Sequence, residues 1–74
     1  MAYYKKGNSG LAIDLLEEAV RKAPRNATYL YHLGLAHQMA GNLSKAKSVL
    51  EQALKIDPES PLAEDIRAAL RELE

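Results

Sequence analysis

Apolar residues recur along this chain at intervals of three and four positions, the spacing that places side chains on one face of an α-helix. Such stripes run through residues 11–23, 27–40, 43–56 and 61–74. Turn-forming residues separate them, at Gly7-Asn8, Pro24, Gly41-Asn42 and Pro58-Glu59-Ser60-Pro61. The pattern therefore predicts an all-α chain of short helices joined by tight turns.

The residues at the segment ends are typical of helix termini. Asn8 or Ser9 can cap a helix that starts near residue 9, and Asn26 and Ser60 can cap the second and fourth helices. Gly41 suits the left-handed conformation that often ends a helix. By the same reasoning Gly7-Asn8 predicts a turn.

The chain repeats itself when residue 7 is placed on residue 41, an alignment that we call the repeat offset. Seven of the 18 positions from residue 7 to residue 24 are identical at this offset: Gly7/Gly41, Asn8/Asn42, Ala12/Ala46, Leu16/Leu50, Glu17/Glu51, Ala19/Ala53 and Pro24/Pro58. This is far more than two unrelated helices would share by chance. One helical unit is therefore used twice.

A helix–turn–helix period of this length resembles the tetratricopeptide repeat. The family places large, small and Pro residues at set positions, and the resemblance implies that the matching residues here pack the repeat: Leu30, Leu33, Gly34, His37, Ala46, Leu50, Ala53 and Pro58. The resemblance implies antiparallel helix–turn–helix repeats stacked as a short right-handed α-solenoid. Gly34 and Ala46 would be the close contact within a repeat, and Ala53 the contact with the next one. Leu30 and His37 depart from the Trp and Tyr that are usual in the family.

The resemblance also divides the chain. Residues 1–26 are expected to be a partial repeat, with its first helix truncated and its second helix at about 9–23. Residues 27–60 form a complete repeat, and residues 61–74 a C-terminal capping helix in which Ala68 takes the glycine position.

Charge and composition limit the classes of partner and the cellular location that we expect. The formal net charge is zero, although residues 1–50 carry +4 and residues 51–74 carry −4, so no nucleic-acid partner is expected. No apolar run is long enough for a membrane span, and no signal peptide is evident. We expect a cytoplasmic protein, or a periplasmic one if the chain was cut from a longer exported protein.

The sequence offers no catalytic constellation. Cysteine is absent, and His32 and His37 are five positions apart, which places them on different faces of one helix. No nucleophile–base pair and no glycine-rich phosphate loop can be found. We therefore expect no enzyme activity, no cofactor and no metal; an enzyme would need a cofactor or a partner subunit to supply the chemistry.

The resemblance implies a binding surface, because the first helix of each repeat lines the concave side in this family. The residues expected there are Thr28, Tyr31, His32, Leu35, Gln38 and Met39. Tyr31, Leu35 and Met39 form an apolar line at intervals of four. An apolar peptide or helix could bind along it. The alternative is that the line packs against residues 61–74 or against a second copy.

A short array also predicts self-association, because each repeat buries its apolar face on a neighbour. The residues expected to be left uncovered are Tyr3, Tyr4, Leu11 and Leu15. A homodimer or higher oligomer could form by packing of this face, or by straightening of the turn at residues 40–42 with a domain swap. The alternative function is thus a self-associating repeat unit, natural or engineered, with no separate ligand.

Overall fold

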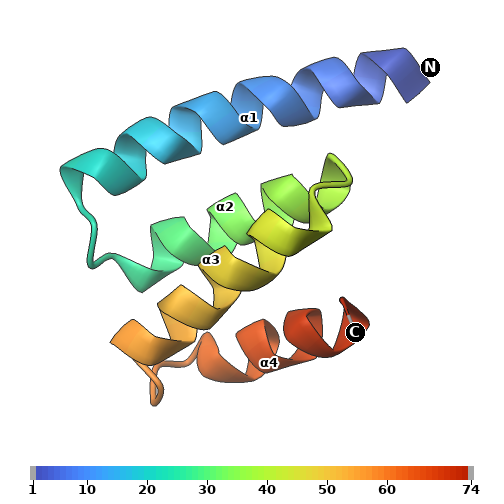
Figure 1. Ribbon diagram of the computed structural model, residues 1–74. Helices are drawn as coiled ribbons and strands as arrows, with labels where there is room; N and C mark the ends of the chain where they lie inside the picture. Colours follow the sequence, from blue (N-terminus) through green and yellow to red (C-terminus); the bar gives the residue numbers. More distant parts are fainter. Residues whose placement is uncertain (1, 74) are drawn as a thin grey trace.

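The computed structural model describes the backbone of residues 2–73 and the side chains of residues 10–73. The chain forms four helices, α1 (Ala2–Lys22), α2 (Ala27–Met39), α3 (Leu43–Ile56) and α4 (Ala63–Glu72), and the described residues contain no strand. Successive helices run antiparallel, and each packs on the next in chain order (Figure 1). The all-α stack of helix pairs expected from the sequence is confirmed.

Helix α1 corrects one prediction. It runs without a break from Ala2 to Lys22, so no turn forms at Gly7-Asn8, and Asn8 and Ser9 lie inside the helix instead of capping it. The physical reason lies in nucleation. Starting a separate helix is costly, whereas extending an existing helix adds a hydrogen bond for each residue fixed. A Gly-Asn pair permits a turn but does not impose one.

The turn at Gly41-Asn42 does form. Gly41 has a φ of 86°, and the Asn42 N–H donates to the carbonyl oxygen of His37 at 2.8 Å. This is the left-handed helix end that the sequence predicts. At the other end of α2, the Tyr29 N–H donates to the Asn26 side chain at 3.1 Å, so Asn26 is the N-cap as predicted.

Replacing Gly41 by Ala is expected to lower the free energy of unfolding by about 1 to 2 kcal/mol, because a side chain at this φ meets its own backbone. No other atom lies within 4 Å of the added Cβ, so backbone strain is the whole cost. Urea unfolding measures the change. Gly41→Asn is the matched control and should lose less, since Asn tolerates the left-handed region. Equal losses for both variants would contradict the explanation.

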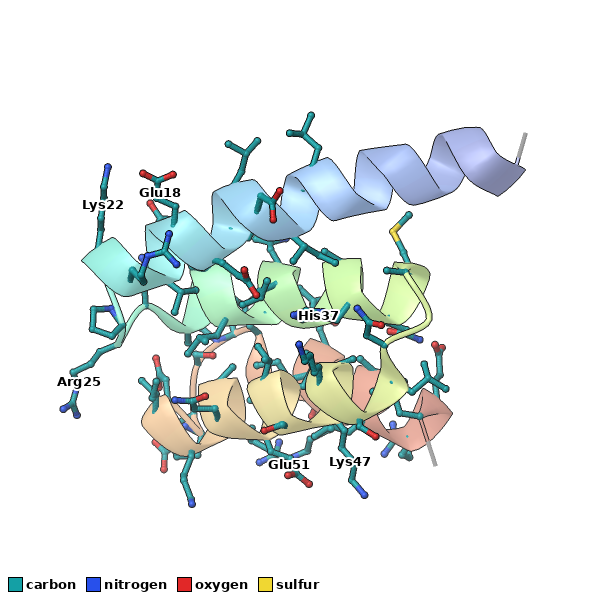
Figure 2. All side chains as sticks on the ribbon, turned by 45° about the horizontal axis from the view of Figure 1, so that its top comes forward. Glu18, Lys22, Arg25, His37, Lys47 and Glu51 are labelled. Carbon is teal, nitrogen blue, oxygen red and sulfur yellow. The ribbon has the colours of Figure 1, made fainter. Side chains whose placement is uncertain are left out.

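Helices α2 and α3 approach each other closely at Gly34. A Cβ at this position would lie 2.6 Å from Leu50 Cγ and 3.5 Å from the Ala46 carbonyl oxygen. Leu30 and Leu33 of α2 are buried around this contact, and so are Ala46, Leu50 and Ala53 of α3. Lys47 and Glu51 lie on the outer side of α3, exposed to solvent (Figure 2).

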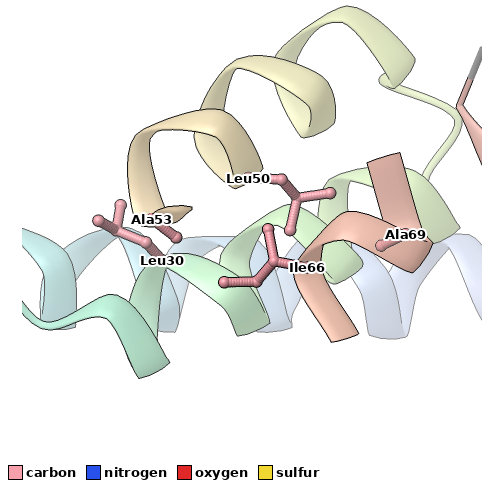
Figure 3. Packing of buried hydrophobic residues seen from close by; sticks show 5 residues of the cluster. All are labelled: Leu30, Leu50, Ala53, Ile66 and Ala69. Carbon is pink, nitrogen blue, oxygen red and sulfur yellow. The ribbon is translucent and has the colours of Figure 1, made fainter. Parts of the chain in front are cut away.

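Helix α4 closes the core. The cluster formed by Leu30, Leu50, Ala53, Ile66 and Ala69 lies where α2, α3 and α4 meet (Figure 3). The helix starts at Ala63, two residues later than predicted. The cause is local: the Leu62 N–H donates to Ser60 Oγ at 3.2 Å, which holds the preceding residues in a turn.

Pro58 requires a second correction. It was expected among the packing residues, but it is exposed, just beyond the end of α3. Because proline cannot donate a backbone hydrogen bond and clashes with a preceding turn of helix, its role is to stop α3 and not to fill the core.

Candidate functional site

The six residues expected on the concave side all belong to α2, but their exposure differs. Thr28, His32 and Met39 are exposed, whereas Tyr31, Leu35 and Gln38 are half-buried. The sequence thus predicts which residues lie on one face of the helix. The exposed fraction of each side chain depends on how the neighbouring helices pack.

Packing within the chain accounts for the half-buried members. Tyr31 and Leu35 pack against the core cluster, to which α4 contributes Ile66 and Ala69. Gln38 Nε2 donates to the Glu72 side chain of α4 at 3.4 Å. Part of the apolar line is therefore used in packing within this chain and is not available to a ligand.

The remaining part is an open strip on α2. Met39 is 78% exposed, the largest exposure among the large apolar side chains of the described residues. The Tyr31 and His32 rings lie side by side, with centroids 5.5 Å apart and planes tilted by 49°. Methionine is flexible and polarisable, and tyrosine offers a rigid apolar ring with a polar tip. The strip is thus suited to contact an apolar surface.

His37 is buried, with 3% of its surface exposed, and it links three parts of the fold. Its Nδ1 lies 3.4 Å from Asn42 Nδ2 in the α2–α3 turn, and its Nε2 lies 4.0 Å from the Glu17 carboxylate of α1. If the Asn42 amide donates to Nδ1, the ring proton sits on Nε2 and faces Glu17. The contact with Glu17 could not be predicted from the sequence, because it joins two helices.

In the region whose side chains are described, no three His, Asp or Glu residues come together as metal ligands. His32 and His37 point to different surroundings, one in solvent and the other inside. Over the same region, no helix is both long and apolar enough to span a bilayer.

A second exposed apolar surface lies on α1. Leu11 and Leu15 are each 62% exposed. Beside them is a hollow of about 470 Å³ between α1 and the start of α2, lined by Leu15, Glu18, Ala19, Lys22, Ala23 and Tyr29. Glu18 and Lys22 form an ion pair at 3.9 Å, and both point away from α2 (Figure 2). Tyr3 and Tyr4, which were expected on this surface, lie outside the described side chains.

The hollow was not visible in the sequence, because Tyr29 comes from a different helix. A further hollow, of about 540 Å³, lies on the outer side of α3 and is lined by Ser48, Glu51, Gln52 and Lys55. These four residues are polar or charged, and no hydrophobic residue lines the hollow. It therefore resembles a solvated helix surface more than a binding site.

Comparison with known proteins decides the family. The family model described as "Tetratricopeptide repeat" matches residues 1–61. The chain belongs to the tetratricopeptide repeat family. The helical pairing, the Gly34–Leu50 contact and the repeat offset are thus features of a TPR array.

Individual relatives agree with this assignment. The chain is 39% identical over 69 residues to the Arabidopsis thaliana protein named probable UDP-N-acetylglucosamine–peptide N-acetylglucosaminyltransferase SPINDLY. It is 38% identical over 60 residues to cellulose synthase operon protein C of Escherichia coli strain K12. These matches cover 92% and 81% of this chain but only 7% and 5% of the relatives. No solved structure matches the chain significantly.

The family fixes the function at a general level. TPR repeats mediate protein–protein interaction and are not themselves catalytic, so the likeness to SPINDLY concerns a repeat segment. The transferase activity in the name of that relative belongs to the relative and is not assigned to this chain. The ligand of this TPR chain depends on the chemistry of its own exposed surfaces.

Proposed function

We propose that this TPR chain is a protein-interaction module that binds an apolar peptide or helix along the concave side of α2, as part of a larger scaffold. The observation that carries the proposal is the exposure of Met39, at 78%, in line with the half-buried Tyr31 and Leu35. An apolar side chain this exposed gains the most from being covered by a partner.

The chemistry of the strip selects the ligand. None of the six concave residues named above carries a formal charge at neutral pH, so a charged tail would find no ion-pair partner among them. An apolar segment would instead bury Met39 and part of the Tyr31 ring. The zero net charge of the chain supports a protein partner over a nucleic acid, and a cytoplasmic location remains our prediction.

The test compares the peptide affinities of variants in which exposed side chains of α2 are truncated to alanine. Peptides selected from a random library on the immobilised protein are titrated against Met39→Ala, His32→Ala and the double variant. We expect Met39→Ala to weaken binding about tenfold, equivalent to about 1.4 kcal/mol. Circular dichroism should be unchanged, because the side chain is exposed. Tyr31→Ala is less informative, since Tyr31 also packs on the core.

The control for this series is Leu15→Ala, which also truncates an exposed apolar side chain, but on α1. It should bind the selected peptides as the unmodified chain does. If Leu15→Ala weakens binding more than Met39→Ala does, the site is not on α2 and the concave-groove proposal is wrong.

A second candidate function rests on the α1 surface. Two large apolar side chains, Leu11 and Leu15, are more than half exposed and lie one helical turn apart. The second candidate is therefore a self-associating repeat unit, a homodimer or higher oligomer, whose partner is another copy of the chain. The two candidates use different helices and can be tested separately.

A further inference from the structure

The two ends of the helical stack have different chemistry. At the repeat offset, the positions of α2 that pack on α3 correspond on α4 to Glu64, Arg67, Ala68 and Arg71. All four are exposed and three are charged. The outer side of α4 is therefore a polar surface, of the kind that terminal repeats expose to water.

The α1 end has the opposite character. Leu15 corresponds at the same offset to Val49, which is half-buried in the stack, yet Leu15 is 62% exposed. If copies stacked head to tail, this apolar surface would meet the charged side of α4 and bury charges without partners, which is unfavourable. An identical α1 surface from a second copy avoids that cost.

The α1 surface is also complementary to itself. Leu11, Leu15, Ala19 and Ala23 follow one another at intervals of four, so they form one strip along the helix. Leu11 and Leu15 form a ridge at one end of the strip. The hollow begins at Leu15 and is lined toward the other end by Ala19, Ala23 and Tyr29. Large and small residues at opposite ends are what an antiparallel pair of identical helices needs, because each ridge then faces a hollow.

The charges on the strip do not oppose such pairing. Glu18 and Lys22 neutralise each other within one copy at 3.9 Å, and both are well exposed at the edge of the hollow. The aliphatic stem of Lys22 can extend over an apolar side chain while its ammonium group stays in water. In an antiparallel pair the two α1 helix dipoles also point in opposite directions, which is favourable.

We propose that two copies of this chain pair through α1, antiparallel about a two-fold axis, with the Leu11–Leu15 ridge of each copy in the hollow of the other. The axis passes near residue 17, so that Leu11 faces Ala23 of the second copy and Leu15 faces its Ala19. This deepens the self-association candidate and does not depend on peptide binding at α2. A strip along one helix is smaller than the roughly 800 Å² per partner of a standard interface, so the dimer should be weak, with a dissociation constant in the high micromolar range.

Sedimentation equilibrium over a concentration series tests the proposal. The mass of the unmodified chain should rise from 8.2 kDa toward twice that value as concentration approaches about 1 mM. Leu11→Gln/Leu15→Gln should stay monomeric at least tenfold higher in concentration, with unchanged helicity because both side chains are exposed. Leu43→Gln, another exposed leucine but on α3, is the matched control and should dimerise as the unmodified chain does.

Cross-linking tests the orientation, and the absence of native cysteine makes it clean. A mixture of Leu11→Cys and Ala23→Cys chains should cross-link through a short bis-maleimide to a mixed dimer. Leu11→Cys alone should not, since its two copies would lie at opposite ends of the paired strip, about 18 Å apart.

The possible outcomes distinguish self-association, pairing through α1 and the antiparallel orientation. A mass that stays at one chain throughout overturns both the α1 pairing and the self-association candidate. Dimers that survive Leu11→Gln/Leu15→Gln overturn the α1 pairing alone and point to exchange at the residue 40–42 turn. Efficient cross-linking of Leu11→Cys by itself overturns the antiparallel arrangement. None of these results bears on peptide binding at α2.

Discussion

Leu50→Ala is expected to leave most of the protein unfolded at 25 °C. Leu50 is fully buried, with 0% exposure, and it fills the space where α3 faces Gly34 of α2 within the core cluster. Truncating a buried leucine costs about 2 to 5 kcal/mol, because the transfer energy is lost and a cavity remains. A single core in a chain of 74 residues supplies no more than about 3 to 5 kcal/mol. The loss is therefore comparable to the whole stability.

Far-UV circular dichroism and urea unfolding provide the measurement. The variant should show much less helix than the unmodified chain, and it should regain helix on addition of a stabilising osmolyte. Leu43→Ala is the control, since Leu43 is on the same helix but 51% exposed, and it should change the free energy of unfolding by less than about 1 kcal/mol. If the two variants unfolded at similar urea concentrations, the core described here would be wrong.

Gly34→Ala and Gly10→Ala are expected to have opposite effects, although both exchange glycine for alanine inside a helix. Alanine is favoured over glycine in helices by about 1 kcal/mol. Nothing lies within 4 Å of a Cβ at Gly10, so that variant should be stabilised by about 0.5 to 1 kcal/mol. At Gly34 the Cβ would lie 2.6 Å from Leu50 Cγ and 2.7 Å from Cδ2. Overpacking of this kind costs about 1 to 3 kcal/mol and outweighs the helix preference.

Thermal unfolding of the two variants decides the matter, because the sign of the change in melting temperature should differ between them. The double variant Gly34→Ala/Leu50→Ala adds a second test. Once Leu50 Cγ and Cδ2 are removed, the added methyl group has room, so Gly34→Ala should raise helicity in this background instead of lowering it. A rise in melting temperature for Gly34→Ala alone would show that α2 and α3 are not in close contact there.

The binding surfaces were predictable in part. Sequence reasoning identified the α2 residues that share one side, because helical periodicity determines which side chains lie together. It could not determine that the core cluster would partly bury Tyr31 and Leu35 and leave Met39 open, since this depends on how helices distant in the sequence pack together. For the same reason the exposure of Leu11 and Leu15 could be predicted, but the hollow beside them, which needs Tyr29, could not.

The sequence alone determined the helical class, the repeat offset, the Asn26 cap and the left-handed turn at Gly41. Each of these depends on interactions within a few residues, or on a pattern repeated along the chain. Only the tertiary structure decided whether Gly7-Asn8 would turn as Gly41-Asn42 does. At Gly41-Asn42 two apolar helices bury their faces against each other, which stabilises the turn. At Gly7-Asn8 the backbone instead continues as part of α1. The same dipeptide therefore has two conformations, and long-range packing selects between them.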